Sequence, residues 1–242
     1  MQPRNEKGQT LEEFLAAYDE NKYRRPSVTV DMAVFTLVKA PGGGHAIAVL
    51  LVRRKDHPFI GTWALPGGFL NMEEELHEAA ARELMEETGV TDAPLTQFGA
   101  FGGVNRDPRT RVITVGHYAL APYGSLTIQA GDDAADAALF RISLKREAST
   151  KDAALYRMRL HGPCELRARV RLVSGPLGLR PTLVPGGDLA SDHSLILFSA
   201  LSALKDVNRR RAAQLLAGDA PGLAIRARRA LAALFSDMDG RM

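Results

Sequence analysis

Three glutamates near the end of one predicted helix are the residues of this chain best placed to do chemistry. Glu83 and Glu87 are four residues apart and Glu86 is three from Glu83, so all three side chains share one side of the helix. Their mutual repulsion does not help a helix to form, and a divalent cation removes it. Ligands that offer only oxygen suit Mg²⁺ or Mn²⁺ rather than zinc or copper. The spacing therefore predicts a magnesium site, with manganese as the alternative, that shares its remaining positions with water and substrate phosphates.

The helix that carries these glutamates is itself predicted by the local sequence. Residues 73–88 contain no Gly or Pro, and Gly89 follows in the position where a helix commonly ends. Arg82 lies four residues after Glu78 and four before Glu86, so it can fix the orientation of a carboxylate by an ion pair. One flank of the helix can pack on a sheet because it is apolar at a spacing of four, at Leu76, Ala80 and Leu84.

The spacing across residues 68–90 resembles the Nudix box, the signature of a family of diphosphate hydrolases. A glutamate-rich helix taken alone is usually a solvated surface helix. The whole pattern is much more specific, and chance agreement somewhere in this chain is below roughly one in a million. The box reads Gly, five residues, Glu, seven residues, Arg-Glu, an aliphatic residue, any residue, Glu-Glu, any residue, Gly and an aliphatic residue. It is matched here without departure by Gly68, Glu74, Arg82, Glu83, Leu84, Glu86, Glu87, Gly89 and Val90.

The resemblance implies a reaction in which a metal-activated water attacks a phosphorus of a diphosphate. Gly67 and Gly68 fit that role because the backbone can approach a metal or phosphate closely where no side chain obstructs it. The roles carried over from the family are those of catalytic and metal-binding glutamates for Glu83, Glu86 and Glu87, a backbone metal contact for the Gly67 carbonyl, and support of the loop and helix for Arg82 and Glu74.

The resemblance leaves the general base open, because some family members use a glutamate of the box and others a carboxylate on a later loop. The later carboxylates of this chain lie in the acidic stretch 131–136, between two predicted strands. They are Asp132, Asp133 and Asp136. An Asp-rich loop between strands is more often a solvated turn, so a base and a turn are both open here.

The flanks of the box point to a subgroup of the family. Residues 11–145, and more weakly 189–205, resemble the subgroup that contains ADP-ribose pyrophosphatases and the Nudix regulators of NAD metabolism. The resemblance implies a nucleoside diphosphate linked to another group as substrate. It favours ADP-ribose, cleaved to AMP and ribose 5-phosphate. Other nucleoside diphosphate sugars, dinucleotides and oxidised nucleotides remain open.

Four residues outside the box are expected to bind this substrate. Arg106 and Arg109 lie on a loop that contains a proline and can grip phosphate with two hydrogen bonds each, and Arg53 can do so from a strand end. Trp63 can stack on a base or a ribose. Each has a plainer alternative, because loop arginines are usually solvated and a single tryptophan more often packs a loop.

The remaining elements predict an α/β fold. Strands are expected at 27–38, 46–54, 95–102, 111–120 and 137–144, with two more between 154 and 173, a loop at 176–188, and helices at 191–216 and 221–235. The fold implied is a Nudix α/β/α sandwich with a mixed sheet and a helical C-terminal extension. The expected divisions are a lead-in helix at 1–26, the Nudix hydrolase domain at 27–190 and the extension at 191–242.

Bulk properties narrow the function classes. The chain has 242 residues and a formal net charge of +3, which does not demand a nucleic-acid partner. A single cysteine, Cys164, excludes an internal disulfide and a cysteine-clustered zinc site. There is no apolar run of about 18 residues and no signal-peptide core, so we expect a cytoplasmic protein that does not enter a membrane. Many family members of this kind are dimers, and the resemblance implies a homodimer.

A DNA-binding regulator is the alternative from another class. The regulators of this subgroup carry a C-terminal winged helix, and the tail of this chain is basic. The intact box and the short tail, 207–242, favour the enzyme, and the expected amphipathic helix at the end can instead pack on its own domain or on a partner subunit. The basic residues concerned are Arg209, Arg210, Arg211, Arg226, Arg228 and Arg229.

Overall fold

The computed structural model describes residues 2–238 except 92, 127, 129–133, 177, 208 and 221, with the backbone alone at 134 and 135. Asp132 and Asp133, two of the three candidate bases, therefore lie outside the described residues. Within the described part, no helix is long and apolar enough to cross a membrane. Cys164 is exposed.

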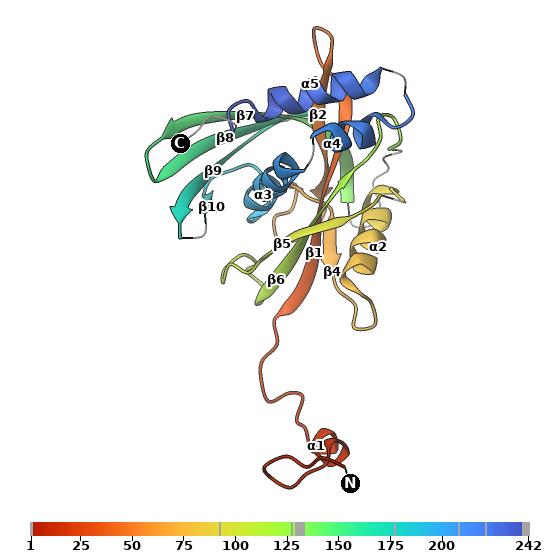
Figure 1. The fold of residues 1–242 in the computed structure, drawn as a ribbon, viewed down its shortest axis with the longest axis vertical. Coiled ribbons are helices and arrows are strands. Elements are labelled where there is room, and N and C mark those ends of the chain that lie inside the picture. The colour runs from red at the N-terminus through yellow and green to blue at the C-terminus, as the bar shows by residue number, and fades with distance from the viewer. Residues whose placement is uncertain are drawn as a thin grey trace.

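One large sheet organises the molecule (Figure 1). Its strands run in the order β10-β9-β8-β7-β2-β1-β6-β5, and the short strands β3 and β4 pair with β2 and β1. β1 is parallel to β6 and antiparallel to β2, so the sheet is mixed, as predicted. The strands are β1 Ser27–Lys39, β2 His45–Arg54, β3 Trp63–Ala64, β4 Gly67–Phe69, β5 Thr96–Phe101, β6 Val112–Leu120, β7 Ala134–Ser149, β8 Ala153–His161, β9 Glu165–Gly175 and β10 Gly178–Val184.

Helices cover both faces of this sheet, which confirms the predicted α/β/α arrangement (Figure 1). α2 packs on one face against the cluster that contains Val30, Met32 and Leu50. α3, α4 and α5 pack on the other face, in the cluster that contains Phe35 and Phe140. Alternate residues of a strand point to opposite faces, so β1 contributes to both cores. The helices are α1 Leu11–Ala16, α2 Leu76–Thr88, α3 His193–Asp206, α4 Arg209–Ala217 and α5 Leu223–Phe235.

Three local predictions were wrong, each for a physical reason. The expected loop at 176–188 contains β10, whose Pro181 is tolerated because β10 is an edge strand. The single helix expected at 191–216 is two helices, because Val207 takes an extended conformation that ends α3. The helix with the glutamates begins at Leu76 rather than three residues earlier, because residues 72–74 form a turn.

The N-terminal helix α1 stands apart from the rest of the molecule (Figure 1). Thr10 and Glu13 form a capping box, in which each side chain accepts a hydrogen bond from the other residue's backbone N–H. No residue of α1 is buried. The helix is therefore held by its cap rather than by packing on the sheet.

The packing of α3 on the sheet generates a stability prediction. Phe198 is fully buried, and its ring lies 5.3 Å from that of Tyr156 on β8. Phe198→Ala leaves a cavity that the sheet cannot fill, so we expect the free energy of unfolding in urea to fall by about 3–5 kcal/mol. Leu179→Ala on β10, at a side chain that is 48% exposed, is the control and changes it by less than about 0.5 kcal/mol. Equal losses in both variants would contradict the assigned core.

Candidate active site

Arg82 ties the start of α2 to the strand before it. Its guanidinium donates two hydrogen bonds to the Glu74 carboxylate, at 2.9 and 2.6 Å, and one to the Phe69 carbonyl at 3.0 Å. It also donates to Glu83 at 2.8 Å and to Glu86 at 3.0 Å. The hydrogen bonds from Arg82 hold the pKa of Glu74 at about 2. Arg82 thus positions the helix and its carboxylates, as the sequence predicted for an ion-paired arginine.

Two glycines of β4 let the glutamates approach the backbone. The Gly67 N–H donates a hydrogen bond of 2.8 Å to the Glu87 carboxylate. A Cβ at Gly68 would lie only 2.2 Å from the carboxyl carbon of Glu83, and a Cβ at Gly67 would lie 2.2 Å from the Val30 carbonyl oxygen. Neither position therefore has room for a side chain, because Glu83 crowds Gly68 and β1 crowds Gly67. The close approach of a metal or phosphate to this backbone stays a prediction.

The two glutamates at this place resist ionisation. Burial raises the pKa of Glu87 to about 8, against the opposing hydrogen bond from Gly67, and the neighbouring charges of Glu83 and Asp31 add to the rise. Burial also raises the pKa of Glu83, against the hydrogen bond from Arg82. Carboxylates that are both desolvated and mutually repulsive favour a state in which a cation neutralises them.

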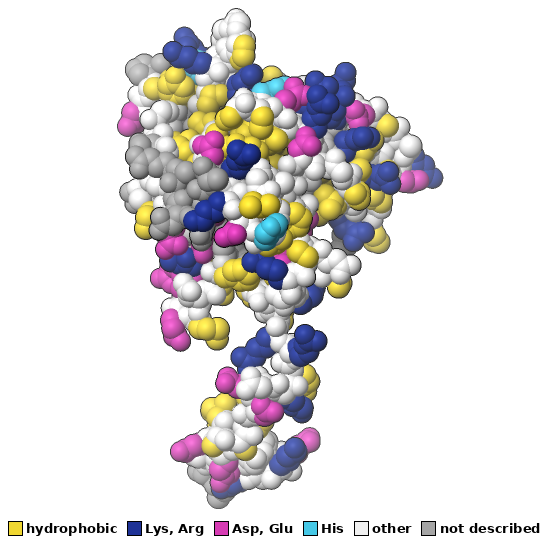
Figure 2. Space-filling model, turned by 180° about the vertical axis from the view of Figure 1, so that it is seen from behind, with side chains coloured by type: hydrophobic (Ala, Val, Ile, Leu, Met, Phe, Trp, Pro, Cys, Tyr) yellow, Lys and Arg dark blue, Asp and Glu magenta, His cyan; other side chains and the backbone are white. Residues whose placement is uncertain are grey.

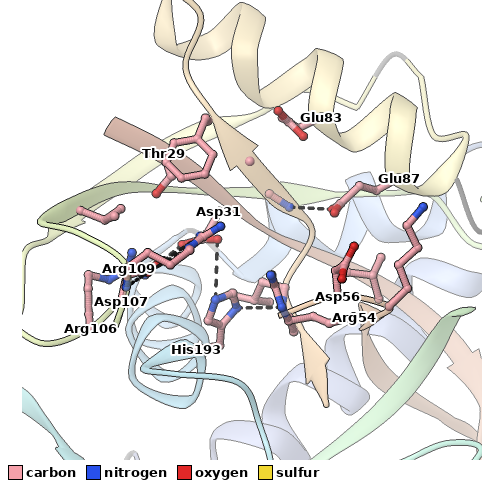
Figure 3. A pocket seen from close by; sticks show the side chains of 18 of the residues that line it. Thr29, Asp31, Arg54, Asp56, Glu83, Glu87, Arg106, Asp107, Arg109 and His193 are labelled. Atoms are coloured by element: carbon pink, nitrogen blue, oxygen red, sulfur yellow. Dashed lines mark hydrogen bonds and ion pairs between the residues drawn. The ribbon is translucent and has the colours of Figure 1, made fainter. Parts of the chain in front are cut away.

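A second charged group faces the glutamates from the opposite side (Figure 3). The Arg106 guanidinium donates to both oxygens of Asp192, at 3.0 and 2.8 Å, and lies 3.4 Å from Asp31. His193 Nδ1 accepts the Leu65 N–H at 2.9 Å, so in the neutral ring the proton is on Nε2, 3.9 Å from Asp31. Burial lowers the pKa of His193, which keeps the ring neutral.

The two glutamates, together with Asp31, Arg106 and His193 of this second group, line one cavity of about 510 Å³. Glu83 and Glu87 project into it from α2, and Asp31 comes from the middle of β1 (Figure 3). Arg54 and Arg109 also line it. Acidic and basic side chains therefore face each other across a space of the size that small-molecule ligands occupy.

The structure does not bring every predicted metal ligand into this cavity. Gly67, Glu83 and Glu87 line it, whereas Glu86 does not. The Glu86 side chain is 51% exposed and points toward Arg82, while that of Glu83 is only 14% exposed. Asp136, the candidate base that the structure describes, lies on β7 opposite Arg53 and is also not among the lining residues.

The four predicted substrate-binding residues lie in different surroundings. Arg109 lines the cavity, pairs with Asp107 at 2.8 Å and stacks over the Phe69 ring. Arg106 also lines it, but its guanidinium is bound by Asp192. The other two lie outside the lining: Arg53 donates to the Gly61 carbonyl, and Trp63 is buried with its ring edge against Phe140. Trp63 therefore packs in the core of the domain, rather than stacking on a ligand or packing a loop, the two alternatives that the sequence left open.

The family follows from sequence comparison. The NUDIX domain model matches residues 30–157 of this chain, which include the strands and the helix of the cavity. This chain belongs to the Nudix family. An ADP-ribose pyrophosphatase of Methanocaldococcus jannaschii is 37% identical over 128 residues, 52% of this chain and 69% of that protein. The ADPR responsive transcriptional repressor NtrR of Acinetobacter baylyi is 38% identical over 109 residues, 44% of this chain and 42% of the repressor.

Solved Nudix structures share the fold. A MutT/nudix family protein from Enterococcus faecalis superimposes with a TM-score of 0.62 and 27% identity, over 93% of this chain and 88% of that chain. The NUDIX domain of Shewanella oneidensis NrtR, in complex with ADP ribose, gives a TM-score of 0.52 and 26% identity, over 81% of this chain and 99% of that chain. The α/β sandwich of this chain is thus a Nudix fold. The chain spans less than half of the Acinetobacter repressor.

The residues of the Nudix box fit a divalent cation with oxygen ligands. Glu83 and Glu87 offer carboxylates beside Gly67, and Gly68 leaves the space that a side chain would close. Among the described residues, no group of three or more His, Cys, Asp or Glu side chains converges into a complete ligand set. Backbone carbonyl, water and substrate phosphate would complete the shell, which is the arrangement that Mg²⁺ accepts most readily.

Sequence analysis missed most of the second charged group. Asp31 is the one charged residue in the buried stretch of β1, residues 30–37, which is a usable signal that it has a special partner. Asp192 directly precedes α3. Asp192 is the N-cap residue but makes no side-chain capping bond, because its carboxylate holds Arg106. His193 shows no metal-ligand spacing in the sequence, and only the fold places it beside Asp31.

The raised pKa of Glu87 generates a pH prediction for the metal-free protein. Between pH 4.5 and 8 the unfolded chain loses this proton while the folded chain keeps it, so the folded state loses stability as the pH rises. We expect the melting temperature in EDTA to fall from pH 5 to pH 8 by at least about 2 °C more in the native protein than in Glu87→Gln.

Glu86→Gln is the matched control, since this glutamate is exposed and lies outside the cavity. It should retain the pH dependence of the native protein. Identical melting curves for the native protein and Glu87→Gln across this range would show that Glu87 is not desolvated as described.

Proposed function

We propose that this protein is a magnesium-dependent Nudix hydrolase that cleaves the diphosphate of a nucleoside diphosphate linked to another group. The preferred substrate is ADP-ribose, with AMP and ribose 5-phosphate as products. The observation that carries the proposal is the pair of half-buried glutamates, Glu83 and Glu87, held against the backbone of Gly67 and Gly68 at the wall of a ligand-sized cavity.

The charges around the cavity suit a diphosphate. The glutamates at one side would hold a cation, and Arg54 and Arg109 line the same cavity. A diphosphate bridges such sites because its oxygens can bind a metal and accept hydrogen bonds from guanidinium groups at the same time. Arg106 is less available for phosphate, since its two strongest hydrogen bonds go to Asp192. It orients the loop that also carries Arg109.

Each group of the site has a distinct role in the proposed reaction. Glu83 and Glu87 would hold Mg²⁺, which when bound would supply activation of a water and neutralisation of charge on the leaving phosphate. Arg82 holds Glu83 in place. His193 Nδ1 accepts the Leu65 N–H and is therefore not free to take a proton from water, while Nε2 lies 3.9 Å from Asp31, beyond hydrogen-bond distance.

The general base of the proposed reaction is either a carboxylate that lines the cavity or an aspartate of the acidic stretch 131–136. Asp56 lines the cavity beside Glu87 (Figure 3) and adds a carboxylate that sequence analysis did not single out. Asp136 lies outside the lining, and Asp132 and Asp133 lie outside the described residues. Within the cavity we favour a carboxylate of the box or Asp56, because a base must reach the water that it deprotonates.

ADP-ribose is favoured by two relatives. The Methanocaldococcus relative is named an ADP-ribose pyrophosphatase, and the Shewanella NUDIX domain is described in complex with ADP ribose. The second of these shares 26% of its residues with this chain. Both relatives are described with ADP-ribose, which supports this ligand over the other nucleoside diphosphates.

A transcriptional regulator is the second candidate, because the Acinetobacter relative is named a repressor that responds to ADPR. In this chain α4 and α5 bury Ala213, Leu216, Ala227, Leu231 and Phe235 in the same cluster as the sheet. The C-terminal helices therefore complete the core rather than standing as a separate domain. This packing favours the hydrolase.

Hydrolysis of ADP-ribose tests the proposal directly. We expect AMP formation with Mg²⁺ by the native protein and a loss of at least about 100-fold in kcat/KM for Glu87→Gln, because removal of a metal ligand forfeits several kcal/mol of charge stabilisation. Glu73→Gln is the matched control at an exposed glutamate outside the cavity and should stay within about twofold of the native rate. Products are separated by anion-exchange chromatography.

Two results would overturn the proposal. One is a native rate that persists unchanged in EDTA, and the other is Glu87→Gln turnover equal to that of Glu73→Gln. Absence of turnover with ADP-ribose and with a panel of nucleoside diphosphate derivatives, together with tight binding of ADP-ribose, would favour the regulator.

A further inference from the structure

A row of arginines covers one face of the sheet far along the chain from the Nudix box. β8 and β9 alternate buried and outward residues, and five of the outward residues are arginines. Neighbouring β7 continues the row. We call this surface the arginine ladder, and its members are Arg141, Lys145, Arg157, Arg159, Arg167, Arg169 and Arg171. β9 lies beyond residues 30–157, the part that the family model matches.

The strand register sets these like charges directly opposite one another. Arg157 is paired with Arg169, Arg159 with Arg167, and Lys145 with Arg157 on the other side. Directly opposed residues in an antiparallel pair have Cβ atoms about 5 Å apart, and like charges there destabilise the sheet. Nothing in the fold of the sheet requires this arrangement, because any polar side chain satisfies an outward position.

Few carboxylates relieve the repulsion. Glu147 pairs with Arg157 at 3.2 Å, and Glu165 pairs with Arg167 at 2.8 Å. Within the described part of the chain, no carboxylate lies within ion-pair distance of Arg159, Arg169 or Arg171. The Nε atom of Arg159 is buried and has no hydrogen-bond partner among the described residues. The ladder therefore carries excess positive charge and an unsatisfied donor.

The ladder surrounds a hollow that is open to solvent. Four of its arginines and three acidic residues, Glu147, Glu165 and Asp188, line a depression of about 490 Å³, and Figure 2 shows Lys and Arg side chains gathered over the region of β7, β8 and β9. None of the ladder residues lines the cavity with the Nudix box. α2 packs on the sheet near β1 and β4 and leaves this part of the sheet uncovered. The lining arginines are Arg157, Arg159, Arg167 and Arg169.

We propose that the arginine ladder is a second binding site, which takes the phosphate backbone of double-stranded DNA. The site is independent of the proposed hydrolase reaction. Arginine guanidinium groups bind phosphate oxygens with two hydrogen bonds and lose little hydration energy in doing so. Phosphate contacts of this kind are independent of base sequence.

The dimensions favour a polymer over a single phosphate group. Three adjacent strands span about 10 Å, and alternate residues along one strand are about 6.8 Å apart. The second distance is twice the axial spacing of about 3.4 Å between phosphates on one strand of B-DNA. A ladder of seven cations on such a grid matches a repeating anion, whereas one phosphate would satisfy only two or three of them.

The ladder and the basic tail make different predictions about which residues bind DNA. We compare the native protein with Arg159→Gln/Arg169→Gln and with Arg228→Gln/Arg229→Gln, a matched loss of two charges on the exposed side of α5. The probe is a fluorescently labelled DNA duplex of about 20 base pairs, with affinity measured by anisotropy over a salt series.

We expect the ladder variant to bind at least tenfold more weakly. The slope of log affinity against log salt should become shallower by about 1.8, since each lost phosphate contact removes about 0.9. The tail variant should remain within twofold of the native protein. Removal of opposed like charges should also leave the melting temperature of the ladder variant at or above the native value, which excludes a folding defect as the cause.

Three outcomes would overturn the proposal. The native protein fails to bind the duplex at low salt, the ladder variant binds as tightly as the native protein, or the tail variant alone loses binding. A lowered melting temperature in the ladder variant is tested further with Arg159→Lys/Arg169→Lys, which keeps the charge. Binding restored by lysine supports the phosphate site, and binding lost despite native stability overturns its electrostatic basis.

Discussion

The contact between α2 and the backbone of β4 is the constraint on which the rest of the site depends. Glu87 accepts the Gly67 N–H, and Glu83 lies so close to Gly68 that no side chain fits between them. Burial then raises the pKa of both glutamates, and this unfavourable ionisation is what a divalent cation removes. Arg82 fixes the position of α2 against β4, because its one guanidinium binds both the loop before the helix and the helix itself.

A second constraint acts from the opposite wall of the cavity. Arg106 joins Asp31 of β1 to Asp192 at the start of α3, and all three side chains are less than 10% exposed. A buried cation between two carboxylates is stable only when its hydrogen bonds are satisfied, so this cluster fixes the distance between β1 and α3. His193 adds a neutral donor and acceptor to the same cluster. The cavity is therefore bounded by two preformed charged walls rather than by mobile side chains.

The sheet gives these walls a rigid frame and also extends beyond them. Helices bury both faces near β1 and β2, but one face of β8 and β9 is left to its arginines. Period-two alternation explains how one strand can contribute to the core and carry a cationic row on its other side. From the sequence, the C-terminal helices are expected to form a basic tail. In the structure, they bury their apolar side in the core. The cluster of positive charge lies on the sheet instead, where the strand register brings the arginines of the ladder together.

The sequence by itself determined what depends on local spacing. The Nudix box, the helix that carries it, the role of Arg82 and most strands follow from periodicity and from residue types within a few positions of one another. Only the tertiary structure decided which distant residues meet. Asp31 and Asp192 are 161 positions apart and share Arg106, β10 exists because it pairs with β9, and Trp63 is held in the core by Phe140. Such partners are selected by the packing of the whole sheet, and no local pattern encodes them.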